Sequence, residues 1–330
     1  MSQFHRQDIF PPQSIAPMSH CATLIELPNG ELLAAWFSGA FETAPDQAIY
    51  TARLAPDANA WTTPQIAVNT PDHADGQPVF LLDHQGILWL YYVTLAGSDW
   101  TTAHIRRRAS NDLGHTWGAE EDLGLEEGYM LRSRPIFLPH LGGSGRWLLP
   151  AYDEKTWRSF MLISEDDGRT WQIGNAIVTP PGNIHACVVP LDEGRLLAYL
   201  RTGGKGGFIW QTFSADGGSS WARPEPTSLP NPNAGLDLIR LPGGPLVLAF
   251  NNSHRRRTPL CVALSDDEGK TWRHLRVLED GDAEFSYPTL AFMRDGMIAA
   301  VYTWKRQCIR YVRFDEVWLR EGKEWQPPEA

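Results

Sequence analysis

The chain has 330 residues, 42% of them hydrophobic and 21% charged, with a formal net charge of −10. This length allows one large domain or two modest ones, and the acidic balance disfavours nucleic-acid and anionic-membrane partners. The first residues, MSQFHRQDIF, lack the apolar segment of a signal peptide, and no run of 18 apolar residues predicts a membrane span. We therefore expect a cytoplasmic protein whose four separated cysteines are free, buried thiols.

Six hairpin-like segments follow one another along the chain. Each consists of an apolar, β-rich run, a turn containing Gly, and a second apolar run. The segments are ATLIELPNGELLAAWF, PVFLLDHQGILWLYYV, PIFLPHLGGSGRWLLPAY, ACVVPLDEGRLLAYLR, DLIRLPGGPLVLAFNN and PTLAFMRDGMIAAVYTW. No helix-length amphipathic stretch competes with this pattern, which predicts an all-β protein.

A second repeat follows most of these hairpins. It reads S-x-D-x-G-x-[TS]-W and occurs as SNDLGHTW (110–117), SEDDGRTW (164–171), SADGGSSW (214–221) and SDDEGKTW (265–272). The Asp accepts hydrogen bonds from turn amides, the Gly supplies a positive φ, and the Trp packs under the hairpin. We call this motif the Asp box.

Together the two repeats give four strands in roughly 50 residues, six times over, which predicts a six-bladed β-propeller with Asp-box repeats. We expect residues 1–330 to form a single domain whose blades begin near residues 20, 77, 134, 185, 235 and 287. The N-terminal segment is expected to supply a strand to the last blade and so close the ring.

The residues at the start of each inner strand should ring a central cavity. They are His20, Gln77, Arg134, His185, the small run 233–235, and Tyr287. Polar residues at five of six equivalent places favour a functional site, whereas the plainer alternative is a solvated channel that tolerates polar groups.

The Asp boxes, the blade count and the segment NIHACVVPLDEGRLLAYLRTGG resemble the sialidase superfamily of BNR-repeat propellers, from about residue 18 to about residue 315. The resemblance implies that the Asp boxes are structural and lie away from the active-site face. It also implies an enzyme that holds a substrate carboxylate with three arginines. A tyrosine–glutamate pair then supplies the nucleophile, and an aspartate acts as acid and base.

The family's site residues carry over only in part. The segment GRLLAYLRT matches the one that ends in the second arginine, which falls on Arg201, and RTPLCVALSDDEGKTW opens with the third, Arg257. The segment YPTLAFMRDG matches the nucleophile segment and implies that role for Tyr287. The chain departs from the family by having His20 in place of the first arginine and His185 in place of the glutamate.

These departures bear on the reaction. A histidine beside arginines is kept neutral and can act as a base. A neutral His185, Tyr287 and arginines around a carboxylate also suit β-elimination from a uronic acid, in which His185 or Tyr287 abstracts the C5 proton and the other group, or His20, protonates the leaving oxygen. Asp46, in the loop FETAPDQAIY, is a further candidate for the acid/base.

We therefore expect an enzyme, a glycosidase or a uronate-specific lyase, that cleaves the bond beside an acidic sugar, uronic or sialic, in an oligosaccharide substrate. No cofactor is expected. A sialidase proper and a non-catalytic acidic-sugar binder remain as alternatives, and the sequence does not predict the oligomeric state. A metal site built from His20, His185 and Asp46 has no ligand-spacing motif in its favour, so no metal is expected.

Four further residues are predicted to bind substrate: Arg134, Gln77, Trp304 and Tyr152. The two aromatic residues end second strands and can stack on sugar rings, although such positions more often serve packing. For Arg134 the alternative to substrate binding is an ion pair with Glu126 or Glu127.

The two family arginines also have plainer alternatives. Arg257 belongs to a run of three arginines, which is usually a solvated surface. Arg201 ends an apolar strand at a Gly-rich loop, where a structural salt bridge is the main competitor.

Overall fold

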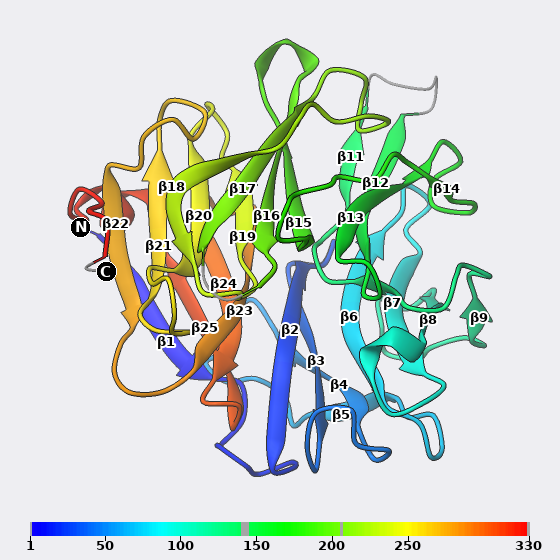
Figure 1. Cartoon of the computed structure of the whole chain (residues 1–330). Helices are drawn as coiled ribbons and strands as arrows, with labels where there is room; N and C mark the ends of the chain where they lie inside the picture. The colour runs from blue at the N-terminus through cyan, green and yellow to red at the C-terminus, as the bar shows by residue number, and fades with distance from the viewer. Residues whose placement is uncertain (1, 140–144, 205–206, 329–330) are drawn as a thin grey trace.

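Six antiparallel sheets form a ring in the computed structural model, which describes residues 2–139, 145–204 and 207–328 (Figure 1). The predicted all-β, six-bladed β-propeller is thereby confirmed. Blade 1 contains β2 (Met18–Glu26), β3 (Leu32–Gly39), β4 (Ala48–Leu54) and β5 (Gln65–Val68). Blade 2 contains β6 (Asp75–Leu82), β7 (Leu88–Leu95), β8 (Ala103–Ser110) and β9 (Glu121–Asp122).

The inner strand of blade 3 is split into two pieces, both of which pair with β12. This blade contains β10 (Tyr129–Leu131), β11 (Ile136–Leu138), β12 (Arg146–Asp153), β13 (Arg158–Ser164) and β14 (Gln172–Ile173). The turn of its hairpin, at residues 140–144, lies outside the described residues. Blade 4 contains β15 (Asn183–Pro190), β16 (Leu196–Thr202), β17 (Gly207–Ser214) and β18 (Glu225–Asn231).

The last two blades lead back to the N-terminus. Blade 5 contains β19 (Asp237–Arg240), β20 (Leu246–Asn251), β21 (Leu260–Ser265) and β22 (His274–Glu279), and blade 6 contains β23 (Phe285–Phe292), β24 (Ile298–Trp304) and β25 (Cys308–Phe314). The outer strand of blade 6 is β1 (Phe4–Asp8), which pairs antiparallel with β25, so the two chain ends lie on the same side of the ring (Figure 1). This pairing covers an edge that would otherwise be open.

Helical structure is minor in the described part of the chain. It consists of the five-residue helix α1 (Glu316–Arg320) after blade 6 and the 3-10 turns η1 (Trp100–Thr102) and η2 (Asp192–Gly194). No helix among the described residues is both long and apolar enough to cross a membrane.

Four inner strands share a β-bulge near their start. The pairing register shifts between His20 and Thr23 in blade 1, and at the corresponding places in blades 2, 4 and 6. The residue inside each shift has a positive φ of 52–57°; these residues are Cys21, Gln77, His185 and Tyr287. A bulge re-aims a side chain, so its repetition collects four side chains at one end of the central channel.

The Asp boxes join third strands to fourth strands, at the opposite end of the ring from the bulges. In the box after β13, Ser164 Oγ accepts from Gly168 N at 2.8 Å and Asp166 Oδ1 accepts from Thr170 N at 2.9 Å. The same pair of hydrogen bonds occurs in the other three boxes. The boxes therefore tie down outer hairpins and leave the bulged end free for chemistry.

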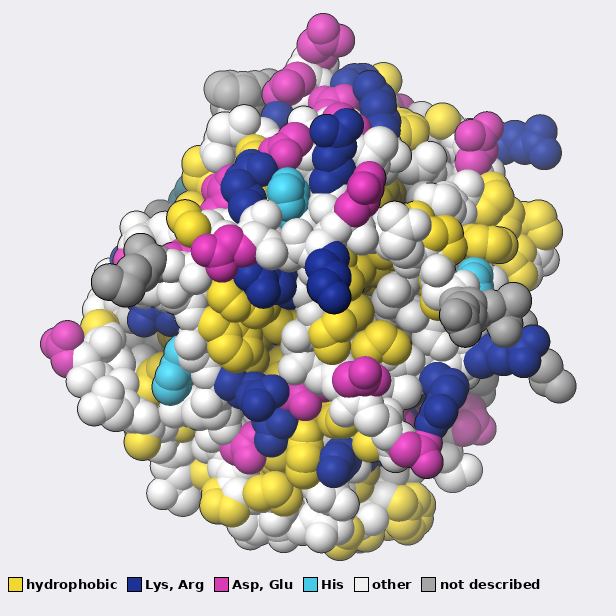
Figure 2. Space-filling view, turned by 90° about the vertical axis from the view of Figure 1, so that its left-hand side faces the viewer, with side chains coloured by type: hydrophobic (Ala, Val, Ile, Leu, Met, Phe, Trp, Pro, Cys, Tyr) yellow, Lys and Arg dark blue, Asp and Glu magenta, His cyan; other side chains and the backbone are white. Residues whose placement is uncertain are grey.

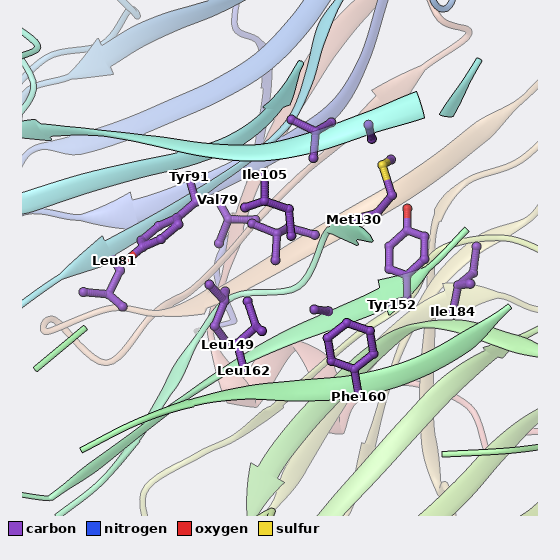
Figure 3. Packing of buried hydrophobic residues seen from close by; sticks show 14 of the residues in the cluster. Val79, Leu81, Tyr91, Ile105, Met130, Leu149, Tyr152, Phe160, Leu162 and Ile184 are labelled. Carbon is purple, nitrogen blue, oxygen red and sulfur yellow. The ribbon is translucent and has the colours of Figure 1, made fainter. Parts of the chain in front are cut away.

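The hydrophobic core lies between neighbouring blades. Figure 3 shows this packing, with Val79 and Tyr91 of blade 2 facing Leu149 and Leu162 of blade 3. Burying a side chain of this size stabilises the fold by about 1.5–3 kcal/mol. Because each blade packs between two others, the starts of the inner strands are held in fixed positions around the channel.

The side of the molecule that carries the chain ends has a mixed surface. Figure 2 shows Lys and Arg side chains interspersed with Asp and Glu on this side, with hydrophobic side chains between them. No single-sign field covers this side, in contrast to the surface that nucleic-acid binding requires.

Candidate active site

The bulged end of the channel has a floor and a wall. The floor consists of residues at the inner-strand starts, and the wall consists of loops that join the second and third strands of each blade. Because strands within a blade alternate in direction, these loops lie at the same end as the inner-strand starts. The wall loops follow β3, β7, β12, β16, β20 and β24.

Tyr287 is the centre of the floor and is only 6% exposed. Its ring lies between two histidines, with ring centroids 4.3 Å from His20 and 5.5 Å from His185. Its hydroxyl oxygen accepts a hydrogen bond from Arg201 Nη1 at 2.8 Å. Tyr287 is therefore held rigidly, with its oxygen beside a positive charge.

Arg201 connects three parts of the floor. Besides Tyr287, it donates from Nε to Asn233 Oδ1 at 2.7 Å, and its Nη1 lies 3.3 Å from His185 Nδ1. Since a guanidinium only donates, His185 Nδ1 is the acceptor, which leaves the Nε2 proton to be donated to Tyr152 Oη at 3.2 Å. Arg201 thus fixes the tautomer of His185 and the position of the Tyr287 oxygen.

Both predicted histidines are almost completely buried. Burial and then the guanidinium of Arg201 lower the pKa of His185 well below its ordinary value. Burial and then Arg306 do the same to the pKa of His20. Both imidazoles are therefore neutral near neutral pH, as the sequence argument expected for His185.

His20 keeps one nitrogen without a partner. Its Nδ1 lies 2.9 Å from Thr303 Oγ1, whereas its buried Nε2 has no hydrogen-bond partner among the described residues. A buried polar nitrogen without a partner is unfavourable by about 1–3 kcal/mol. This atom is therefore available to a ligand oxygen or a water.

Blade 3 contributes Arg132 to the floor, two residues before the predicted Arg134. Arg132 Nη2 donates to the carbonyl oxygens of Tyr287 and Pro288 at 2.9 and 3.0 Å, and the side chain is buried. Arg134 instead donates to the carbonyls of Leu238 and Leu290, near the other end of the channel. Sequence reasoning thus chose the wrong arginine of "LRSRP" for the cluster around Tyr287.

An alternating chain of charges joins the wall loops to Glu284, which directly precedes β23. Arg257 Nη1 donates to Glu284 Oε1 at 2.9 Å, Arg306 Nε donates to Glu284 Oε2 at 2.9 Å, and Arg306 Nη1 reaches Glu42 Oε2 at 2.5 Å. Trp100 Nε1 then donates to Glu42 Oε1 at 3.2 Å. Two carboxylates thus share one guanidinium at the mouth of the site.

Glu284 is ionised across the physiological range. Burial opposes its charge, but His20, Arg257 and Arg306 outweigh burial and lower the pKa of Glu284 to about 2. Because His20 itself is neutral near neutral pH, the two guanidinium groups are the partners that hold the carboxylate there.

The pKa of Glu154, in the wall loop after β12, is shifted in the opposite direction from that of Glu284. Burial raises its pKa to about 7, helped by Asp153 and Glu42 and opposed by the attraction of Arg201. Its side chain makes no hydrogen bond within the part of the chain that the structure describes. A carboxyl group that is half protonated near pH 7 is suited to act as a general acid or base.

Two predicted residues have other contacts. Asp46 is exposed and its Oδ1 accepts from Ala40 N at 3.1 Å, so it caps a turn, while Glu42 of the same loop reaches the site. Trp304 packs against Lys305 and Arg310, with centroid distances of 4.3 and 4.5 Å. The structure therefore does not bring Asp46 or the Trp304 ring to Tyr287.

Two others remain on the floor in supporting positions. Gln77 Oε1 accepts from Cys21 Sγ at 2.7 Å, and Tyr152 is fully buried against His185. Neither offers a ring or a free charge to a sugar. In the wall, the loops after β7 and β12 contribute the aromatic residues Trp100 and Trp157, and the Trp157 ring centroid lies 5.7 Å from Arg201 Cζ.

The residues that sequence reasoning missed come from one class of loop. Glu42, Trp100, Glu154 and Arg306 all lie between second and third strands, the class that also supplies Arg257. A search of the equivalent loop in every repeat would have found them. Among the described residues, no group of three or more His, Cys, Asp or Glu side chains is arranged to hold a metal ion.

The site has an excess of positive charge in an acidic protein. Arg132, Arg201, Arg257 and Arg306 surround the floor and mouth, against the carboxylates of Glu42 and Glu284 and the half-protonated Glu154. The Nη2 group of Arg201 has no hydrogen-bond partner among the described residues, so it is available to an anion.

A family match and a sequence relative both agree with the propeller architecture. Residues 30–300 match the BNR repeat-like domain family. A sialidase from Micromonospora viridifaciens is 26% identical over 344 aligned positions, which cover 92% of this chain and 52% of that protein. The chain therefore spans about half the length of that relative.

Solved structures share the fold at low sequence identity. The Hadza microbial sialidase Hz136 superposes with a TM-score of 0.80 at 18% identity, over 95% of this chain and 69% of that chain. An α-L-arabinanase from Penicillium chrysogenum, complexed with arabinobiose, superposes with a TM-score of 0.71 at 16% identity, over 98% and 99% of the two chains. With the family match extending over most of its length, the chain belongs to the BNR repeat-like domain family, within the sialidase superfamily of β-propellers.

Proposed function

We propose that the protein cleaves the glycosidic bond of an acidic sugar, uronic or sialic, within an oligosaccharide. The observation that carries the proposal is the arginine cluster around Tyr287. The guanidinium carbons of Arg132, Arg201 and Arg257 lie 5.5, 5.7 and 5.3 Å from its ring centroid. Concentrating cations in this way, in a chain of net charge −10, favours a substrate carboxylate.

Two groups are assigned to the chemical step. Tyr287 is the reacting group on the floor, and negative charge that develops on its oxygen is stabilised by the N–H of Arg201 that already points at it. Glu154 in the wall, protonated in half of the molecules near pH 7, donates a proton to the leaving oxygen. The sugar carboxylate binds the free Nη2 group of Arg201.

Elimination from a uronate is the second candidate route, and the two neutral histidines favour it. In elimination Tyr287 first passes its phenol proton to the unpartnered Nε2 of neutral His20. The phenolate takes the C5 proton, the C4–O bond breaks, a C4=C5 double bond forms, and the leaving oxygen gains its proton from Glu154 or from the His20 that has become protonated. In hydrolysis the same phenolate attacks the anomeric carbon, the leaving oxygen takes the proton of Glu154, and water later releases the sugar from Tyr287. Lewis-acid help is not needed for either route, because guanidinium groups neutralise the carboxylate.

The proposal is tested with two acidic hexasaccharides, α-1,4-linked galacturonate and α-2,8-linked sialic acid, beside the neutral maltohexaose. Ultraviolet absorbance of the C4=C5 double bond reports elimination, and new reducing ends without that absorbance report hydrolysis. Cleavage of either acidic probe, with the neutral probe intact, is the expected result. Cleavage of maltohexaose in preference to both acidic probes would contradict the proposal.

Glu154→Gln is expected to lower kcat/KM on an oligosaccharide about 10²–10⁴-fold, because the leaving oxygen then departs without a proton. In the wild-type protein the pKa of Glu154 near 7 means that the acid form, and with it the rate, falls as pH rises through about 7. The variant should lose this alkaline limb, since the amide does not titrate. The pH profile of kcat/KM measures both effects.

Glu193→Gln is the matched control, because Glu193 is exposed on the turn between β15 and β16, at the end of the ring opposite the site. It should keep the wild-type pH profile. An alkaline limb that persists in Glu154→Gln would assign the proton donor to another group.

A further inference from the structure

A groove opens beside the site, between blades 3 and 4. Its cavity of about 810 Å³ falls in the range of about 300–1,000 Å³ that small-ligand sites occupy. Three segments line it: the turn between β12 and β13, the link from blade 3 to blade 4, and the approach to β18 together with β17. Pro180, Pro224 and Pro226 stiffen two of these walls.

The groove combines two indoles with two unpaired cations. Trp157 and Trp210 line it together with Arg158 and Arg223, and neither guanidinium has an ion pair or a hydrogen bond within the described part of the chain. Glu225 adds a single carboxylate, so the lining keeps a positive excess. Indole faces stack on sugar rings, and free guanidinium groups bind carboxylates in pairs of hydrogen bonds.

Trp157 joins this groove to the site. Its ring lies 5.7 Å from Arg201 Cζ on one side, and the residue lines the groove on the other. A Cβ atom on Gly182 would come within 2.8 Å of the Trp157 side chain, and one on Gly203 within 3.0 Å. The two glycines thus form the slot that holds the indole between the two spaces.

The same turn carries the proposed proton donor. Glu154 and Trp157 are three residues apart, between β12 and β13. A sugar that leaves with the proton of Glu154 therefore departs from the end of the site at which this turn lies, and the groove begins at this turn.

We infer that the groove binds a second acidic sugar, on the leaving-group side of the bond that is cut, with its carboxylate on Arg158 and Arg223 and its ring on an indole. The inference rests on the proposed function in one respect, because the proposed cleavage defines the side of the bond on which the groove binds the sugar. It narrows the substrate class to glycans in which acidic sugars follow one another.

The test compares two substrates that contain the same acidic sugar: the hexasaccharide and the methylumbelliferyl glycoside of the single sugar. One such pair contains galacturonate and the other contains sialic acid. In Arg158→Ala/Arg223→Ala the ratio of kcat/KM for the hexasaccharide to that for the monosaccharide should fall about tenfold or more, equivalent to about 1.4 kcal/mol. The charge-matched control is Arg169→Ala/Arg273→Ala, two exposed residues of which the first lies in one Asp box and the second directly follows another. It should keep the wild-type ratio.

An unchanged ratio in the groove variant, with active wild-type protein, would overturn the inference and leave the proposed function standing. If the wild-type protein cleaves no acidic probe, the proposed function fails, and calorimetric titration with the galacturonate and sialic acid hexamers then decides the groove by itself. The inference about the groove is supported if the groove variant binds a hexamer at least tenfold more weakly than the wild-type protein and the control variant binds it equally well. Equal binding by all three proteins, or none, overturns it.

Discussion

Tyr287→Phe is expected to lower kcat about 10²–10⁴-fold while the Kd for the acidic sugar stays near the wild-type value. The change removes only the hydroxyl that accepts from Arg201 and leaves the ring between His20 and His185. Because the carboxylate is held by guanidinium groups, binding does not depend on the phenol oxygen. Single-turnover rates and calorimetric titration with the same sugar separate the two quantities.

Tyr199→Phe is the matched control for this prediction. Tyr199 is as deeply buried, and its hydroxyl donates to Gly269 O at 3.2 Å, near an Asp box and far from the chemistry. It should keep wild-type kcat. A Tyr287→Phe protein that turns over within tenfold of wild type would remove Tyr287 from the chemical step.

Arg201→Lys is expected to lower kcat/KM about 10²-fold or more. A lysine ammonium cannot reach Asn233, Tyr287 and a substrate carboxylate together, and each hydrogen bond to a charged group contributes about 1.5–3 kcal/mol. Substrate whose carboxylate is a methyl ester provides the sharpest measurement. The wild-type protein should strongly prefer the acid over the ester, and the variant should lose most of that preference.

Arg195→Lys controls for the substitution itself, because Arg195 pairs with Glu268 on the surface. Its preference for acid over ester should equal that of the wild-type protein. If Arg201→Lys also kept the full preference, another group would bind the carboxylate.

The fold was predictable because its signals are local and repeated. The Ser, Asp and Gly of each Asp box form the same turn through hydrogen bonds that span only four residues, as Ser164 and Gly168 show. Six hairpins of similar length then leave few arrangements other than a propeller. Neither the turns nor the hairpins depend on how distant segments of the chain meet.

The floor of the site was predictable in part, because strand starts recur in register. Tyr287, His185 and Arg201 meet as expected. The exception is blade 3, where the inner strand breaks between Leu131 and Ile136. This break changes the direction in which the intervening residues point, so Arg132 rather than Arg134 reaches the centre.

The wall was not predictable from strand patterns, since it depends on contacts between loops far apart in the chain. Glu42 and Arg306 are separated by 264 positions and meet only when blade 6 closes against blade 1, and Glu284 gains Arg257 only when blade 6 packs against blade 5. The raised pKa of Glu154 likewise comes from burial in the folded ring. Such properties belong to the tertiary structure.

The most direct test of the account measures turnover on pairs of methylumbelliferyl glycosides that differ only in the carboxylate: glucuronide against glucoside, galacturonide against galactoside, and sialoside against its methyl ester. The arginine cluster around Tyr287 predicts that at least one acidic member is cleaved with a kcat/KM about 10²-fold or more above that of its uncharged partner. Equal or faster cleavage of the uncharged members in every pair would contradict carboxylate recognition by this site.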